Sequence, residues 1–433
     1  MFKNIPKLIA KSETVSHIGK IENVVGMTIE ATGGNASIGD IGMIYSENRN
    51  QHIPAEVVGF KDDRILLMPY EDIGGIAAGS FIRNTRNRLK IPVGNNLTGQ
   101  ILDAMGKPID QTKLFEPEAY YYADSKYTNP LTRPPIHEKL QFGVKAIDSM
   151  LTIGKGQRVG IFAGSGVGKS TLLGMIAKNV KADINVIALV GERGREVREF
   201  IEKDLGEEGL KRSVLVVATS DQPAMLRLKC PLVATTIAEY FKDQGKDVLL
   251  MMDSLTRFAM AQREVGLAIG EPPIARGYTP SIYAELPKLL ERSGNFEKGS
   301  ITGVYTVLVE GDDTNEPIAD MVRGILDGHI VLSRRLANEN HFPAIDVNAS
   351  ISRLMSTIAD PEHQKLASSL RDILSIYEKN LDLISIGAYK SGTNPRLDYA
   401  ISKIDKVNDF LKQGIYESFA FEDTIARLRE ILA

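Results

Sequence analysis

The chain has 433 residues, more than one ordinary hydrophobic core holds, so two or three domains are expected. Its 52 basic and 55 acidic residues leave a net charge of −3, a balance that disfavours a nucleic-acid translocase. The single cysteine, Cys230, excludes an intrachain disulfide and fits a reducing cytoplasm, and no stretch approaches the roughly 18 apolar residues of a membrane span.

Residues 1–13 lack the apolar core and the small-residue cleavage site of a signal peptide. Phe2, Ile5, Leu8 and Ile9 recur at helical spacing among lysines, a pattern typical of an amphipathic helix that docks on a partner or a membrane surface. Pro6 opposes a long helix, so a frayed terminus is the alternative. We assign residues 1–18 as an N-terminal docking segment.

Residues 19–88 alternate short apolar runs with Gly, Asn and Asp turns. Residues 57–60 and 65–68 are such runs on either side of a charged turn, which predicts a hairpin. Several hairpins within about 70 residues predict a small closed β-barrel, because closure removes exposed sheet edges. The barrel shows no catalytic pattern and is expected to be structural. Residues 120–135 are expected to form a surface linker.

Residues 89–358 alternate near-continuous apolar runs with helical stretches, which predicts a parallel sheet covered by helices on both faces, an α/β domain. From residue 359 to residue 433 apolar residues recur at spacings of three and four, which predicts a helical C-terminal domain. The expected strands of the sheet are residues 158–162, 185–190, 214–219, 248–252 and 303–309.

A phosphate-binding loop is predicted between an apolar strand and a helix, with Ala163 in place of its first glycine. Its glycines let backbone N–H groups turn toward phosphates, and the helix N-terminus adds the positive end of its dipole. Lys169 is expected to reach the β- and γ-phosphates of ATP, and the Ser170 hydroxyl to ligate Mg²⁺. A chance glycine-rich turn is the alternative. The predicted nucleotide-binding residues are Gly164, Ser165, Gly166, Val167, Gly168, Lys169, Ser170 and Thr171.

Two further strand ends carry candidate catalytic groups. Asp253 ends an apolar strand and is expected to hold Mg²⁺ through water. Glu192 follows another strand and can orient the attacking water, while Arg193 could stabilise leaving-group charge or hold Glu192 in place. A surface loop of paired charges is the alternative for residues 192–196.

Together, residues 162–170, 191–196 and 252–259 resemble the rotary F-/V-type ATPase superfamily, and most closely its flagellum-specific ATPases of the type III export apparatus. Residues 275–281, 305–313, 325–330 and 343–347 resemble the same family. The resemblance implies a subunit with an N-terminal barrel, a central RecA-like ATPase domain and a C-terminal helical domain, assembled as a homohexamer.

The resemblance also implies roles for single residues. Glu192 matches the catalytic carboxylate, Arg353 matches an arginine finger that reaches a neighbouring subunit's nucleotide, and Arg257 matches a phosphate-facing arginine. Gln364 stands where the family often has a tyrosine that stacks on adenine, so the purine contacts depart from the family pattern. Implied partners are a stator-like regulatory subunit, the export gate and export chaperone–substrate complexes. The implied location is the cytoplasm, peripheral at the inner face of the plasma membrane.

Three alternatives stay open from the sequence. A virulence-type secretion ATPase has the same chemistry, although residues 322–328 look more flagellar. A non-catalytic nucleotide-binding subunit of a rotary ATP synthase would carry a non-acidic residue at Glu192. A ring-shaped RNA translocase would need aromatic and basic faces on its barrel, and residues 19–88 show only scattered aromatics, so no nucleic-acid partner is expected.

Overall fold

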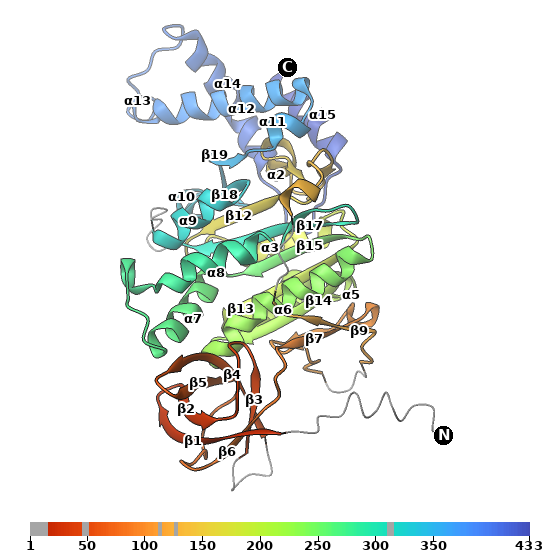
Figure 1. The fold of residues 1–433 in the computed structure, drawn as a ribbon. Helices are drawn as coiled ribbons and strands as arrows, with labels where there is room; N and C mark the ends of the chain where they lie inside the picture. The colour runs from red at the N-terminus through yellow and green to blue at the C-terminus, as the bar shows by residue number, and fades with distance from the viewer. Residues whose placement is uncertain (1–15, 46–51, 111–114, 125–128, 310–315) are drawn as a thin grey trace, which may run out of the picture.

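The structure is a computed structural model that describes residues 16–45, 52–110, 115–124, 129–309 and 316–433. A barrel at one end, a central sheet flanked by helices, and a group of helices at the other end follow one another along the molecule (Figure 1). The predicted fold class is confirmed. The docking segment assigned to residues 1–18 falls almost entirely outside the described residues.

The N-terminal part is a closed six-stranded antiparallel barrel in the order β1-β2-β5-β4-β3-β6. Ile21, Ile29, Ile44 and Leu67 fill its interior and are all completely buried. The predicted hairpin is present, and its turn places Asp62 at a φ of 53°. The strands are β1 (His17–Val25), β2 (Thr28–Gly33), β3 (Ile41–Tyr45), β4 (His52–Lys61), β5 (Arg64–Pro69) and β6 (Phe81–Asn84).

The expected linker at residues 120–135 is wrong in its first part. Strand β9 (Ala119–Tyr122) pairs with β7 (Lys90–Val93) in a two-stranded antiparallel ribbon. Tyr121 packs edge-on against Tyr240, with ring centroids 5.8 Å apart, while the tyrosines on either side of it are exposed. Three identical residues in a row concealed the alternation of faces that marks a strand.

The central part is a nine-stranded, mostly parallel sheet in the order β19-β18-β12-β17-β15-β13-β14-β8, with β16 (Gly294–Asn295) beside β17. All five strands that the apolar runs predict are present. The remaining bounds are β8 (Ile101–Asp103), β12 (Arg158–Ala163), β13 (Ile184–Glu192), β14 (Ser213–Thr219), β15 (Asp247–Asp253), β17 (Ser300–Leu308), β18 (Gly328–Leu332) and β19 (Ile345–Ser352).

Helices cover both faces of this sheet, so its strands are apolar on both sides. Along β13, Val186 and Ala188 enter the core under α6 (Ala224–Asp243), α7 (Leu255–Ala268) and α8 (Pro280–Leu290). Ile187 and Leu189 enter the core on the opposite face, under α3 (Lys169–Asn179). The carboxyl ends of β12, β15 and β13 therefore share one edge, where a helix follows each strand.

The C-terminal part consists of helices, the longest being α12 (Pro361–Lys379), α14 (Pro395–Leu411) and α15 (Phe421–Leu432). Leu370, Val407 and Leu428 are buried and join the core beneath α3, so these helices pack on the central domain. In the part of the chain that the structure describes, no helix is long and apolar enough to cross a membrane.

Candidate active site

The predicted phosphate loop connects the carboxyl end of β12 to the N-terminus of α3. Gly166 and Gly168 have φ values of 77° and 87°, the left-handed region that side chains rarely adopt, which explains glycine at both positions. Ala163 is still part of β12 and does not have a positive φ, so its methyl group is tolerated where the pattern has glycine. Backbone N–H groups at the start of α3 are thus available for an anion.

Lys169, Asp253 and Glu192, three residues predicted for the catalytic site, lie together at the carboxyl edge of the sheet. Lys169 forms an ion pair with the Asp253 carboxylate, and its Nζ lies 3.6 Å from Glu192 Oε1. The Thr306 hydroxyl on β17 donates to Asp253 Oδ1 at 2.7 Å and fixes that carboxylate. Burial opposes the charge of Lys169, but Asp253 and Glu192 outweigh it and raise the pKa of the lysine.

Glu192 is the least satisfied member of this cluster. Burial, together with the charge of Asp253, raises the pKa of its carboxyl to about 7, against the lowering effect of Lys169. Its Oε1 is buried and has no hydrogen-bond partner among the described residues. An acid with a pKa near neutrality and an oxygen that accepts no hydrogen bond from the described residues is suited to bind and polarise a water molecule.

The metal ligands predicted from the sequence lie at the same edge. Asp253 is 5% exposed at the end of β15, and Ser170 is exposed in the first turn of α3. A carboxylate and a hydroxyl are hard oxygen donors of the kind that Mg²⁺ prefers, and Mg²⁺ takes its other ligands from water and phosphate. Among the described residues no cluster of three His, Cys, Asp or Glu side chains could hold a metal ion.

Arg257 lies beside this cluster on the first turn of α7. Its buried Nε has no hydrogen-bond partner among the described residues, as expected of a group that faces a phosphate. A Cβ atom at Gly191 would come within 3.1 Å of the Arg257 Cβ, so glycine lets β13 approach α7 this closely. The sequence alone offered no sign of this contact.

Two predicted residues do not join the cluster. The Arg193 side chain is 79% exposed and pairs with Glu196 at 3.2 Å, so in this chain it contacts neither Glu192 nor Lys169. The Thr171 side chain lies beside Asp204, whose segment packs against α3. The structure therefore gives both side chains partners outside the catalytic cluster.

Arg353 lies at the opposite edge of the sheet. It follows antiparallel β19, whose last residue, Ser352, pairs with Gly328 at the beginning of β18. The loop lies at the other end of β12, roughly 17 Å away at about 3.3 Å per strand residue. Arg353 is exposed and cannot reach the phosphate loop of its own chain.

The adenine side of the site differs from the phosphate side. Gln364 donates to the carbonyls of Ser356 and Ala359, so its amide caps local structure. The preceding His363 is buried and lies 2.6 Å from the Ser149 carbonyl. An aromatic ring that sequence reasoning missed, Phe342, lies 3.4 Å from a Cβ built on Gly168 and is 40% exposed.

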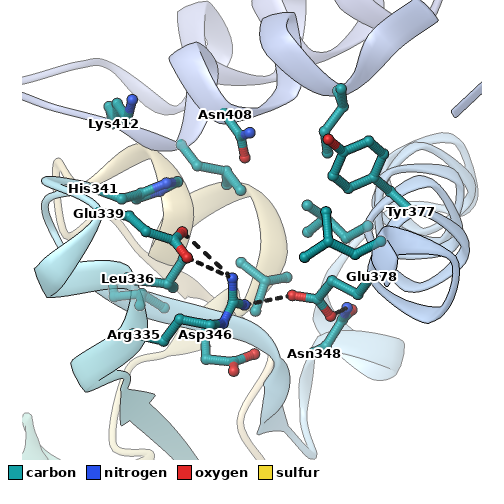
Figure 2. A pocket seen from close by; sticks show the side chains of 16 residues that line it. Arg335, Leu336, Glu339, His341, Asp346, Asn348, Tyr377, Glu378, Asn408 and Lys412 are labelled. Atoms are coloured by element: carbon teal, nitrogen blue, oxygen red, sulfur yellow. Dashed lines mark hydrogen bonds and ion pairs between the residues drawn. The ribbon is translucent and has the colours of Figure 1, made fainter. Parts of the chain in front are cut away.

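A separate cavity of about 350 Å³ lies between β19 and the C-terminal helices and does not include the phosphate loop. Figure 2 shows Arg335 between Glu339 and Glu378, and the pair with Glu378, at 2.7 Å, joins the central domain to α12. His341 also lines this cavity, and the next residue, Phe342, touches the loop. The cavity thus lies at the domain junction beside the nucleotide site.

Three family models match the chain, one on each of its parts. Residues 143–352 match the nucleotide-binding domain of the ATP synthase alpha/beta family, and residues 21–86 match the β-barrel domain of that family. Residues 359–430 match the C-terminal domain of the type III secretion ATPase EscN. The loop, the acidic strand ends and the three-part fold thus define a nucleotide-binding ATPase of the ATP synthase alpha/beta class.

Relatives narrow this class. The chain is 56% identical to the flagellum-specific ATP synthase of Bacillus subtilis, over 98% of this chain and 97% of that protein. It is 47% identical to a type 3 secretion system ATPase of Xanthomonas euvesicatoria, over 95% and 93%. The assembled ATPase EscN of the enteropathogenic E. coli type III secretion system superposes with a TM-score of 0.91 at 46% identity, covering 96% of this chain and all of that one. The chain belongs to the family of flagellar and type III secretion ATPases.

Proposed function

We propose that this ATPase hydrolyses Mg-ATP at the interfaces of a homohexameric ring and thereby energises or assists export of flagellar proteins through a type III secretion apparatus. The observation that carries the proposal is the placement of the Lys169 ammonium between Asp253 and Glu192, with Glu192 Oε1 buried and without a hydrogen-bond partner among the described residues. A phosphate loop, a metal-binding carboxylate and a general base occupy one edge of the sheet.

In this proposal each residue of the carboxyl edge has a separate role in ATP binding or hydrolysis. Loop N–H groups and Lys169 bind the β- and γ-phosphates, which draws the ammonium away from Asp253. Glu192 accepts a hydrogen bond from the attacking water and orients it in line with the γ-phosphate. Arg257 offers its Nε to a phosphate oxygen. Asp253, through water, and the Ser170 hydroxyl would hold Mg²⁺, which would supply positive charge to neutralise the phosphates.

Arg353 supplies the remaining cation in trans. Arg353 lies at the edge of the sheet away from its own loop, which supports a role at the nucleotide site of a neighbouring copy. A guanidinium supplied by a neighbour stabilises charge that develops on the γ-phosphate and makes turnover depend on assembly. Arg193, exposed beside Glu192, could stabilise the same charge only after moving away from Glu196.

The relatives support the proposed assembly, and the location is part of the same proposal. EscN was solved as an assembled ATPase and in complex with its central stalk EscO, which supports a hexamer around a stalk-like partner here. We extend the partners to a stator-like regulatory subunit, the export gate and export chaperone–substrate complexes. The location is cytoplasmic, peripheral at the inner face of the membrane.

A virulence-type secretion system is the second candidate, because a relative that serves as a type 3 secretion system ATPase is 47% identical. Deletion of the gene separates the two systems. Loss of motility and of external flagellar proteins supports the flagellar system. Normal motility with loss of another secreted protein set supports the virulence system.

ATP turnover of a Glu192→Gln variant tests the catalytic assignment. Glutamine preserves shape but cannot act as a base, so turnover is expected to fall by about 10²–10⁴-fold while ATP binding persists. Glu199→Gln is the matched control, because Glu199 lies on the following helix in a surface pair with Arg195. Turnover of the Glu192 variant near the wild-type rate would falsify the assignment of Glu192.

A further inference from the structure

The amino edge of the sheet holds a second cluster of charged groups, centred on Asp327. Asp327 directly precedes β18, beside the first residue of β12, Arg158 (Figure 1 shows these strands side by side). Its Oδ2 accepts hydrogen bonds from the backbone N–H of Arg158 at 3.1 Å and from its Nε at 3.2 Å. The Asp327 N–H in turn donates to the Arg158 carbonyl at 2.9 Å.

The rest of the Arg158 guanidinium is also engaged. Its second terminal nitrogen lies 3.4 Å from Asp327 Oδ1, and its first terminal nitrogen pairs with Glu291. Hydrogen bonds between a guanidinium fork and a carboxylate are charge-assisted and directional, so they hold orientation as well as position. Asp327 and Arg158 therefore fix the start of β18 to the start of β12.

The backbone of Arg353 is also held by Asp327. Its backbone N–H donates to the Asp327 carbonyl at 2.9 Å. The buried Gln157 side chain donates to that carbonyl at 3.2 Å and to the Ser352 hydroxyl at 3.0 Å. The Arg353 guanidinium has a long contact, 3.4 Å, with the Arg323 carbonyl. The backbone of Arg353 is thus fixed, while its side chain is exposed.

We infer that Asp327 is a positioning residue for Arg353. Through Arg158 it attaches the base of the finger to β12, the strand whose other end becomes the phosphate loop. One rigid strand then carries the loop of a subunit's own site at one end and the finger for the next site at the other. The inference rests on the proposed role of Arg353 in trans.

A purely structural role for Asp327 makes a different prediction. If the Asp327–Arg158 pair only stabilises the sheet, its loss harms the subunit that carries the substitution, including that subunit's own loop. If the pair positions Arg353, its loss harms the site of the neighbouring subunit and leaves the subunit's own loop intact. The two roles can therefore be separated in rings that contain two kinds of subunit.

The first measurement compares Asp327→Asn with wild type. Asparagine keeps the size of the side chain and one acceptor oxygen but loses the charge-assisted fork. We expect kcat to fall by roughly 10-fold to 50-fold with KM for ATP unchanged, less than the loss for Arg353→Ala. Glu208→Gln, which breaks an exposed pair with Lys211 on another helix, is the matched control. A raised KM with unchanged kcat would overturn the inference.

The second measurement mixes variants before assembly. In rings with equal amounts of Asp327→Asn and Glu192→Gln, the first variant supplies an intact nucleotide site and the second an intact finger. About a quarter of the interfaces then join these two intact parts. Turnover should therefore rise above that of either variant alone. The mixture of Arg353→Ala and Glu192→Gln is the reference. A gain in the reference without a gain for Asp327→Asn overturns the positioning role, and no gain in the reference overturns the finger in trans itself.

If Asp327→Asn does not assemble, Arg158→Lys takes its place. Lysine retains the positive charge but cannot form the fork to Asp327, and it leaves the Asp327 backbone unchanged. The same two outcomes then apply, with the melting temperature and ring size of the variant measured alongside. Restoration in the mixed ring supports the inference, and its absence beside a restored reference contradicts it.

Discussion

The charged groups at the two edges of the central sheet differ in how far hydrogen bonds within the chain satisfy them. At the carboxyl edge, buried Glu192 Oε1 and Arg257 Nε have no hydrogen-bond partner among the described residues, and Lys169 is drawn to two carboxylates. At the amino edge, the Asp327 carboxylate accepts from Arg158 at both oxygens. Arg353, at the same edge, has an exposed side chain.

This difference indicates which groups are meant for substrate. A buried polar atom without a hydrogen bond costs free energy, about 1–3 kcal/mol, so Glu192 Oε1 and Arg257 Nε are candidates for contacts with a ligand. We therefore expect ATP to bind at the carboxyl edge and to supply these missing contacts. At the amino edge the Asp327 carboxylate is satisfied by Arg158, and in the proposed function the exposed Arg353 acts on another molecule of the same chain.

The largest effect is expected from Arg353→Ala. Loss of a finger should lower turnover by about 1,000-fold or more while ATP binding changes little, because the carboxyl edge is untouched. Turnover at increasing protein concentration and ATP affinity are the two measurements. The rise in specific activity on assembly, expected for wild type, should be absent from the variant.

The matched control for this prediction is Arg429→Ala. Arg429 is also partly exposed, but it pairs with Glu362 among the C-terminal helices. It should retain near-wild-type turnover and its dependence on concentration. If wild-type activity per subunit does not depend on concentration, even at dilutions where the ring dissociates, the difference between the two edges has no catalytic meaning.

Much of this arrangement could be predicted from the sequence. Apolar runs located the five strands, the glycines with Lys169 located the loop, and strand ends located Asp253 and Glu192. The order of the strands could not be read from such runs. Strand β17 lies between β12 and β15 in the sheet, although more than a hundred residues separate it from β12 in the sequence. The Thr306 contact with Asp253 depends on that order.

Other residues stayed hidden for related reasons. The closeness of Gly191 to Arg257 and of Phe342 to Gly168 joins residues distant in sequence through tertiary packing. No local pattern encodes such contacts. Arg353 was recognised by resemblance, and only the antiparallel pairing of β19 with β18 shows why it cannot serve its own loop. The docking segment at residues 1–18 stays a prediction.

An intermediate effect is expected from pH, through Glu192. Its pKa is raised to about 7 by burial and by Asp253, so the carboxylate that acts as base is lost as the pH falls below 7. The wild-type kcat/KM should decrease by about tenfold per pH unit on the acid side of neutrality. Turnover between pH 5.5 and 8.5 measures this, and the residual activity of Glu192→Gln corrects for the ionisation of ATP itself.

The same shift has a consequence for stability of the nucleotide-free protein. A folded pKa raised above the ordinary value of 4.5 means that folding holds an extra proton, so stability falls as pH rises from about 4.5 to about 7. Glu192→Gln should therefore raise the melting temperature more at pH 8 than at pH 5. An equal change at both pH values would show that Glu192 ionises normally in the folded protein.

The smallest effect is expected on the adenine side, where neither edge of the sheet supplies a charge. The exposed Phe342 ring lies beside Gly168, and Gln364 has no ring to stack on a base. Phe342→Ala is expected to raise KM for ATP by about fivefold, the equivalent of a weak stacking contact of about 1 kcal/mol, with kcat unchanged. Gln364→Tyr is the opposing variant and should lower KM. If Phe342→Ala instead lowers kcat, the ring supports the phosphate loop and does not stack on adenine. Phe342 would then be part of the catalytic machinery at the carboxyl edge.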